Sequence, residues 1–168
     1  MSKIVMTMLV VLLVGCATAS ADSKYWTYGD PAKVSLFNDG TIEIQTIPTP
    51  KLVIGDISYP SAYCSNNGYV CIKSEDFSFA VPLDISDEIR SWDIDGLHFD
   101  NIGNRKLDVF GKIFNVFYIE FKMENMTYTF IFSTMHGLLG IKGTGALFDR
   151  TLLLMEGSCG FGASKDCK

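Results

Sequence analysis

Residues 117–124 read Phe-Tyr-Ile-Glu-Phe-Lys-Met-Glu, so Phe, Ile, Phe and Met alternate with Tyr, Glu, Lys and Glu. A β-strand places successive side chains on opposite faces, whereas a helix would need apolar residues three or four positions apart. The aromatic and β-branched content of the stretch also favours extended backbone. We therefore predict a strand with one buried face.

The segments that follow continue the same pattern. Residues 127–133 alternate again, and residues 138–142 form a third apolar run. The short polar turns at 124–126 and 135–137 separate the three runs as hairpin turns would. A meander of three antiparallel strands is the prediction for this half of the chain.

The first half supplies further strand candidates at residues 41–47, 51–58 and 77–81, and residues 151–155 add one near the end. Together these segments give about eight strands in a chain of 168 residues, a length that suits a single domain. The predicted fold class is all-β, with one antiparallel sheet forming a small barrel or a sandwich.

One stretch has helical spacing. Ser86 could cap a helix, acidic residues would occupy its first turn, and Ile85, Ile89 and Trp92 would share a face. The sequence therefore predicts one short helix between two of the strands.

The amino terminus has the layout of a secretory signal. Lys3 precedes an apolar run over residues 4–14, which is shorter than the roughly twenty residues that a membrane-spanning helix needs. Leu13-Val14-Gly15-Cys16 then resembles the lipobox of bacterial lipoproteins, in which the cysteine accepts diacylglycerol before cleavage. The resemblance concerns processing alone, and implies residues 1–15 as signal peptide and Cys16 as the lipidated residue.

A second cleavage site competes with the lipobox. Small residues at Ala19 and Ala21 fit a general signal peptidase, which would release a soluble periplasmic or secreted chain. We favour the lipobox because Cys16 otherwise has no role. Residues 16–32 are then the lipidated cysteine and a tether, and residues 33–168 are the β domain. The resemblance implies a location at the periplasmic face of the bacterial outer membrane.

Four cysteines remain after either cleavage, and in an exported chain an even count indicates two disulfides. Asn67-Gly68 is a strong hairpin-turn signal, and a turn centred there places Cys64 opposite Cys71. Directly opposed residues lie within the distance that a disulfide can bridge. We therefore predict Cys64 paired with Cys71 and, by elimination, Cys159 paired with Cys167.

Charge and motifs exclude several functions. A net charge of -5, which becomes -6 once Lys3 is removed, with no basic stretch makes nucleic acid an unlikely partner. No nucleophile elbow, phosphate-binding loop, zinc motif or calcium loop occurs, so no cofactor or metal is expected. Alternation does place His98 and Asp100 on one strand face, and with His136 they form the basis of an alternative, a periplasmic hydrolase.

Two clusters are candidates for partner binding. Tyr25, Trp26 and Tyr28 lie beside the tether, where they could form a contact surface or dock back onto the domain. An acidic cluster could steer a basic partner, or could be a solvated face; it comprises Asp84, Asp87, Glu88, Asp93 and Asp95.

The function predicted from these observations is non-catalytic. The chain is expected to be a cell-envelope lipoprotein, attached to the membrane by its lipid anchor, whose disulfide-braced β domain binds another envelope or exported protein. An inhibitor or immunity protein is one form of this prediction. The alternatives are the hydrolase and a carrier that holds an apolar ligand inside the barrel.

Overall fold

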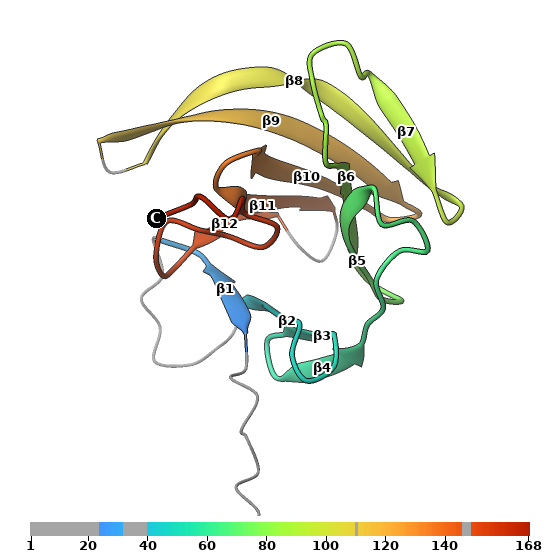
Figure 1. Cartoon of the computed structure of the whole chain (residues 1–168). Helices are drawn as coiled ribbons and strands as arrows, with labels where there is room; N and C mark the ends of the chain where they lie inside the picture. The colour runs from blue at the N-terminus through green and yellow to red at the C-terminus, as the bar shows by residue number, and fades with distance from the viewer. Residues whose placement is uncertain (1–23, 32–39, 110, 146–148) are drawn as a thin grey trace, which may run out of the picture.

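The computed structural model describes residues 24–31, 40–109, 111–145 and 149–168, and in these ranges it contains twelve β-strands and no helix (Figure 1). The predicted all-β class is confirmed. No helix in these ranges is long and apolar enough to cross a membrane. The strands are β1 (Tyr25–Gly29), β2 (Ile42–Gln45), β3 (Lys51–Ile54), β4 (Ile57–Pro60), β5 (Tyr69–Lys73), β6 (Ser78–Pro82), β7 (Ser91–Ile94), β8 (Leu97–Val109), β9 (Lys112–Met123), β10 (Met126–Ser133), β11 (Gly137–Gly145) and β12 (Arg150–Leu154).

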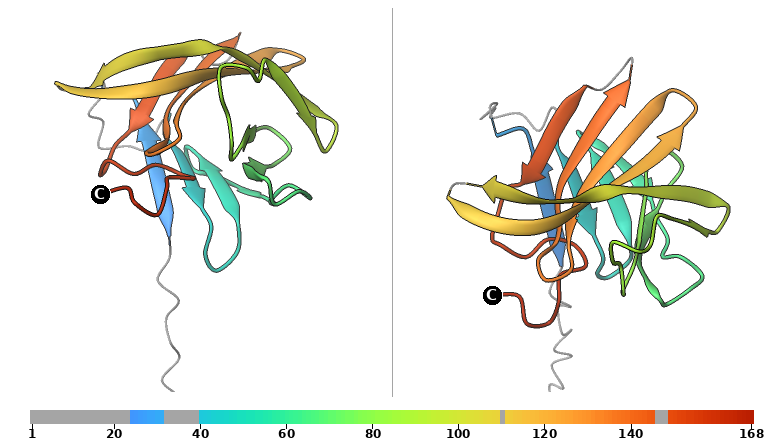
Figure 2. Two further views of the ribbon diagram at one scale, coloured as in Figure 1. Left: turned by 45° about the horizontal axis from the view of Figure 1, so that its top comes forward. Right: turned by 90° about the horizontal axis from the view of Figure 1, so that it is seen from above.

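Ten of these strands form one antiparallel sheet in the order β4-β3-β2-β1-β12-β11-β10-β9-β8-β7, and β5 and β6 form a separate hairpin. The sheet has two free ends, at β4 and β7, so it does not close. The expectation of a small barrel or a sandwich with about eight strands is therefore wrong in its detail. Instead, a single open sheet curves around a hairpin that lies inside its curve (Figures 1 and 2).

The predicted meander is present as β9, β10 and β11. Tyr128 lies opposite Phe121, and Phe130 lies between Ile119 on one side and Ile141 on the other. All five side chains are buried on the inner face of the sheet. The alternation along residues 117–124 is thus explained by burial of one strand face against the hairpin.

The inner core is dominated by aromatic rings from the hairpin and the sheet. Phe79 of β6 lies 4.9 Å from Phe130 and 6.0 Å from Phe132, centroid to centroid, and Phe77 lies 5.6 Å from Phe130. Burying one such side chain stabilises a fold by roughly 1.5–3 kcal/mol, and each edge-to-face pair adds about 0.5–1.5 kcal/mol. Packing against the sheet therefore stabilises a hairpin that would be marginal alone.

A second, smaller core lies on the outer face. Seen from above, β8 and β9 run across β10, β11 and β12 instead of alongside them for their whole length (Figure 2). Phe114 and Val116 of β9 form a buried cluster there with Ile131 and Leu139. A register shift in β8 between Asn101 and Gly103 accompanies this bend, and a local bulge increases strand twist.

The short helix predicted around Ser86 is absent. Residues 83–90 form successive turns, and Ser91–Ile94 is the edge strand β7, paired with β8. Ile85 and Trp92, which the predicted helix would place on one apolar face, are buried, but the backbone that carries them is not helical. A helix of two turns is marginal by itself, and pairing with the long β8 supplies backbone hydrogen bonds that a helix would otherwise have to make locally.

The boundary predicted between tether and domain also needs correction. Tyr25–Gly29 is strand β1, which pairs with β2 on one side and β12 on the other. These residues therefore lie in the middle of the sheet and belong to the β domain. The signal peptide, Cys16 and the residues around the alternative cleavage site lie outside the described residues.

Candidate functional site

Both predicted disulfides are present. Cys64 bonds to Cys71 and Cys159 bonds to Cys167, with Cα atoms 5.7 and 5.9 Å apart. An antiparallel bridge between Ala62 and Lys73 sets the first pair opposite each other, as expected. Two disulfides in one domain indicate an oxidising, extracytoplasmic location.

The turn inside the first disulfide differs from the prediction. A two-residue type I′ turn needs positive φ at both central positions, yet neither Asn67 nor Gly68 has one. Instead, the Asn66 side chain accepts a hydrogen bond from the Gly68 N–H at 2.8 Å. The prediction that Cys64 bonds to Cys71 is correct because the two residues are directly opposed, although the turn between them is not of type I′.

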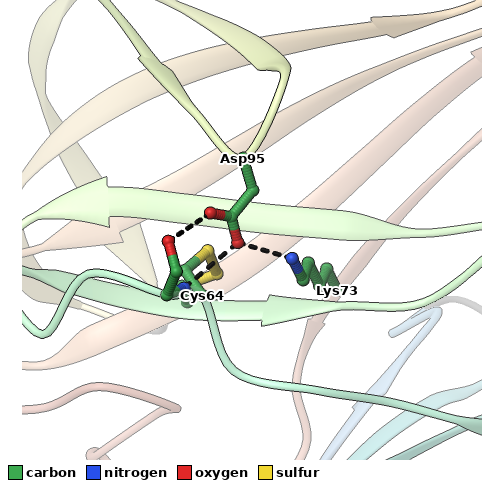
Figure 3. A network of polar contacts seen from close by, with 5 residues as sticks. Cys64, Lys73 and Asp95 are labelled. Carbon is green, nitrogen blue, oxygen red and sulfur yellow. Dashed lines mark hydrogen bonds and ion pairs between the residues drawn. A yellow bond between two sulfur atoms is a disulfide. The ribbon is translucent and has the colours of Figure 1, made fainter.

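Asp95 joins the tip of the β7–β8 hairpin to this disulfide loop (Figure 3). Its carboxylate accepts hydrogen bonds from the backbone N–H of Ser65 at 3.1 Å and from the Ser65 hydroxyl at 2.5 Å, and it forms an ion pair with Lys73 at 2.5 Å. These contacts, the Lys73 bond first, lower the pKa of Asp95 to about 2. Asp95 is thus a structural contact and not a free acid for a partner.

His98 lies between two carboxylates on the same hairpin. Its Nδ1 is 2.8 Å from Asp93 and its Nε2 is 3.4 Å from Asp100, and all three residues keep substantial solvent exposure. The hydrogen bond with Asp93, followed by the attraction of both carboxylates, raises the pKa of His98. Both ring nitrogens therefore face acids, which leaves neither directed at a substrate.

His136 is at the other end of the sheet. The register places the start of β8 beside the end of β9 and the start of β10, whereas His136 follows the end of β10. There it packs edge-on against Phe114 at 4.9 Å, and its burial lowers its pKa. The structure brings Asp100 to His98 but does not bring His136 to either, so the three residues of the hydrolase alternative do not converge.

The aromatic cluster of β1 is docked onto the domain. Tyr28 is fully buried, its hydroxyl donates to the Leu138 carbonyl at 3.0 Å and accepts from the Phe161 N–H at 3.2 Å, and burial raises its pKa. The Trp26 indole donates to the Cys159 carbonyl at 3.0 Å and packs edge-on against Phe161. Only Tyr25, which is about half exposed, remains available to a partner.

The acidic cluster is divided among different contacts. Asp93 binds His98 within the β7–β8 hairpin, Asp95 binds Lys73 of β5, and Asp87 accepts a hydrogen bond from the Asn104 amide. Asp84 and Glu88 are exposed in the turns before β7. Among the described residues, no group of three or more His, Cys, Asp or Glu side chains is placed to hold a metal ion.

Sequence reasoning missed a cleft of about 640 Å³ at one end of the inner face. It opens between β2–β4 on one side and the turn that joins β9 to β10 on the other. Its apolar lining comes from Ile42, Ile54, Tyr59, Met123, Met126 and Tyr128. The two methionines carry the signal that could have found it, because flexible thioether side chains adapt to varied apolar ligands.

The polar groups of this cleft are acidic or neutral. Asp76, from the turn between β5 and β6, and Glu124, from the β9–β10 turn, are both exposed at its rim beside Asn125. The backbone carbonyl of Asp76 accepts a hydrogen bond from the Tyr128 hydroxyl at 3.2 Å, which ties the hairpin to the cleft wall. None of the described residues that line it is cationic.

Fold and disulfides define an extracytoplasmic all-β domain with an apolar, acid-rimmed cleft and no assembled catalytic group among its described residues. Comparison of the chain with protein-family models, with curated proteins and with solved structures finds no match.

Proposed function

We propose that this protein is a non-catalytic binding module of the bacterial cell envelope, which holds an apolar side chain of another envelope or exported protein in the β2–β4/β9–β10 cleft. The observation that supports this proposal is the combination of an apolar floor with two carboxylates at the rim. Clefts that take a small ligand or a side chain typically measure about 300–1,000 Å³. A large aromatic or aliphatic residue is of suitable size.

The charges at the rim specify the rest of the partner. Asp76 and Glu124 lie on different walls, so a Lys or Arg flanking the inserted side chain can approach one of them. The net charge of the whole chain, -5, acts in the same direction by speeding the encounter with a basic surface. An inhibitor or immunity protein for a basic target is one form of this function.

The lipobox resemblance supports an anchored form. If Cys16 carries the lipid, the nine residue steps to Tyr25 limit the separation of domain and membrane surface to about 30 Å. Two or more acyl chains make such anchoring stable. The module is then presented close to the membrane, and partners that lie at that depth are the relevant ones.

Intact mass spectrometry of the protein expressed with its own signal in a bacterium tests the anchor. A mature chain that begins at an acylated Cys16 is the expected result. A chain that begins at Asp22 without lipid overturns the anchor and leaves the cleft proposal to be tested separately.

Three short amidated peptides test the cleft, each titrated by calorimetry into the mature protein. Lys-Trp-Lys is expected to bind weakly. Glu-Trp-Glu is expected not to bind because its charges repel the acidic rim, and Lys-Ser-Lys is expected not to bind because it lacks the apolar side chain. Glu124→Lys should weaken Lys-Trp-Lys binding at least about threefold through loss of the rim attraction. Glu156→Lys, a charge reversal at an exposed position away from the cleft, is the matched control.

The same cleft gives the second candidate, a carrier of an apolar ligand. Dodecanoate distinguishes the two functions because it is apolar but anionic. Tight dodecanoate binding that is insensitive to Glu124→Lys, with no response to Lys-Trp-Lys, overturns the partner-binding proposal and supports the carrier.

A further inference from the structure

Strand β8 is longer than the strand that covers its edge. β7 pairs only with residues 97–100 of β8, and the last backbone bond on that side runs from the Asn101 N–H to the Arg90 carbonyl at 2.8 Å. From Ile102 to the end of β8 at Val109, no strand of the described chain pairs on that side. β9 pairs on the other side through to Val109.

An unpaired edge of this kind can accept another strand, because its outward N–H and C=O groups have no strand partner. Folded proteins usually block such edges with proline, with a very short strand or with a covering segment. Residues 102–109 contain no proline, and the bulge lies at their start and not along them. Among the described residues, this edge is bordered by its own charged side chains and, near its start, by Asp87 of the turn before β7, which contacts Asn104.

Those charges are complementary to themselves. Lys106 and Asp108 are two residues apart, so they lie on one face of β8, and both are exposed. When two copies of a strand pair antiparallel about Leu107, Lys106 of each copy lies directly opposite Asp108 of the other. We propose that a second copy of this chain adds to the β8 edge in this register and forms a two-fold symmetric dimer with a continuous sheet.

The opposite face supports the same register. Leu107 pairs with Phe114 of β9 within one copy and lies on the face of the outer core. In the dimer Leu107 faces its own symmetry mate, so the row across the interface runs Phe114, Leu107, Leu107 and Phe114. Apolar pairs directly opposed across strands are stabilising, as are opposite charges.

Neighbouring registers lack this match. A two-fold axis perpendicular to the sheet keeps each face continuous. Because directly opposed residues lie on the same face, one residue of the strand must then face its own symmetry mate at the axis. Centring the pair on Arg105, Lys106 or Asp108 places that charged residue against its own mate, which is destabilising. Centring it on Asn104 leaves Lys106 opposite Ile102, and the Asn104 amide already donates to Asp87.

The free edge is short, so the dimer is expected to be weak. Interfaces that remain stable at low concentration bury about 1,200–2,000 Å² in total, more than a pair of short edge segments provides. Self-association in the micromolar to millimolar range is the expected behaviour. This inference does not depend on the cleft, whose lining includes no residue of β8.

Sedimentation equilibrium of the mature protein over a concentration series tests the proposal. Lys106→Asp and Asp108→Lys should each weaken self-association about tenfold or more, because each creates two like-charge pairs. An equimolar mixture of the two variants should associate again, since every facing pair then has opposite signs. Lys165→Asp and Glu75→Lys, reversals at exposed positions elsewhere, are the controls and should leave association unchanged.

A cysteine variant tests the register directly. Directly opposed residues have Cα atoms about 4.5–5.5 Å apart, within disulfide range, so Leu107→Cys should form an intermolecular disulfide on mild oxidation. Arg105→Cys is the control, because the two symmetry-related positions would lie about 14 Å apart. A protein that stays monomeric throughout the series, a mixture that does not associate, or equal crosslinking at both positions overturns the proposal.

Discussion

The two faces of the sheet are covered by different kinds of structure. The inner face is covered by a separate hairpin, β5–β6, which a disulfide and the Asp95 contacts hold in place. The outer face is covered, over a smaller area, by the sheet's own β8–β9 hairpin bending across it. The inner cover depends on contacts distant in sequence, whereas the outer cover depends on the bend of one continuous pair of strands.

The largest difference in stability between the two faces should appear when one aromatic ring is removed from each. Phe130 is fully buried and contacts three aromatic rings, so Phe130→Ala should lower the free energy of unfolding by about 4 kcal/mol. Phe114→Ala, in the smaller outer cluster, should cost about half as much. Urea denaturation measures both, and Phe130→Leu replaces the alanine variant if that fails to fold. Equal losses would show that the outer cluster is as important as the inner one.

The two disulfides give the next comparison. Each closes a loop of similar length, 7 and 8 residues in sequence separation, so chain entropy predicts a loss near 2.5 kcal/mol for either. Cys64 and Cys71 are buried in the inner core, but Cys159 and Cys167 are only partly buried. The double variant Cys64→Ser/Cys71→Ser should therefore lose more stability than Cys159→Ser/Cys167→Ser, as judged by urea midpoints. A reversed order would contradict this assignment of the inner core.

The Asp95 contact predicts an acid-dependent loss of stability. Because the folded-state pKa is lowered to about 2, the contribution is fully present above the ordinary carboxyl pKa and disappears as the pH falls from about 4 towards 2. Asp95→Asn should lower Tm at neutral pH and flatten the decline of Tm over that acidic range. Asp84→Asn, at an exposed position, is the control and should keep the wild-type pH profile.

The smallest effect concerns the two histidines. The pKa of His98 is raised by Asp93 and Asp100, and that of His136 is lowered by burial, so NMR titration should find them on opposite sides of the usual value. The His98 contribution to stability is present below that value and is lost as the pH rises through the raised pKa. Asp93→Asn should bring the His98 pKa back towards normal, whereas an unchanged pKa would contradict the hydrogen bond.

Sequence patterns identified the parts of this fold that depend on local order. The alternation at residues 117–124 predicted β9 because a half-buried strand requires it. The spacing of Cys64 and Cys71 predicted their bond because the register that opposes them is set within a few residues. Helical spacing placed Ile85, Ile89 and Trp92 on one face, and Ile85 and Trp92 are buried although the helix is absent.

Features that depend on distant partners could not be predicted in this way. Ser91–Ile94 is a strand because β8 lies beside it, and β1 is central because β12 reaches it from the far end of the chain. The cleft combines side chains from β2–β4 with the β9–β10 turn, and nothing in either segment indicates the other. The hydrolase alternative placed His136 with His98 only because no pattern showed that they lie at opposite ends of the sheet.

The position of β1 also bears on how the chain can fold. Tyr28 pairs with Ile42 on one side and with Leu154 on the other, so β2–β4 join the rest of the sheet only through a contact between nearly the first and the last strand. Such pairing gives a high contact order, and proteins of this kind fold slowly. In a chain exported amino terminus first, the edge of β1 that pairs with β12 would stay unpaired until Arg150–Leu154 had followed. During that interval it would be exposed to the chaperones and proteases of the compartment in which it folds, so its yield there is expected to depend on them more than its final stability suggests.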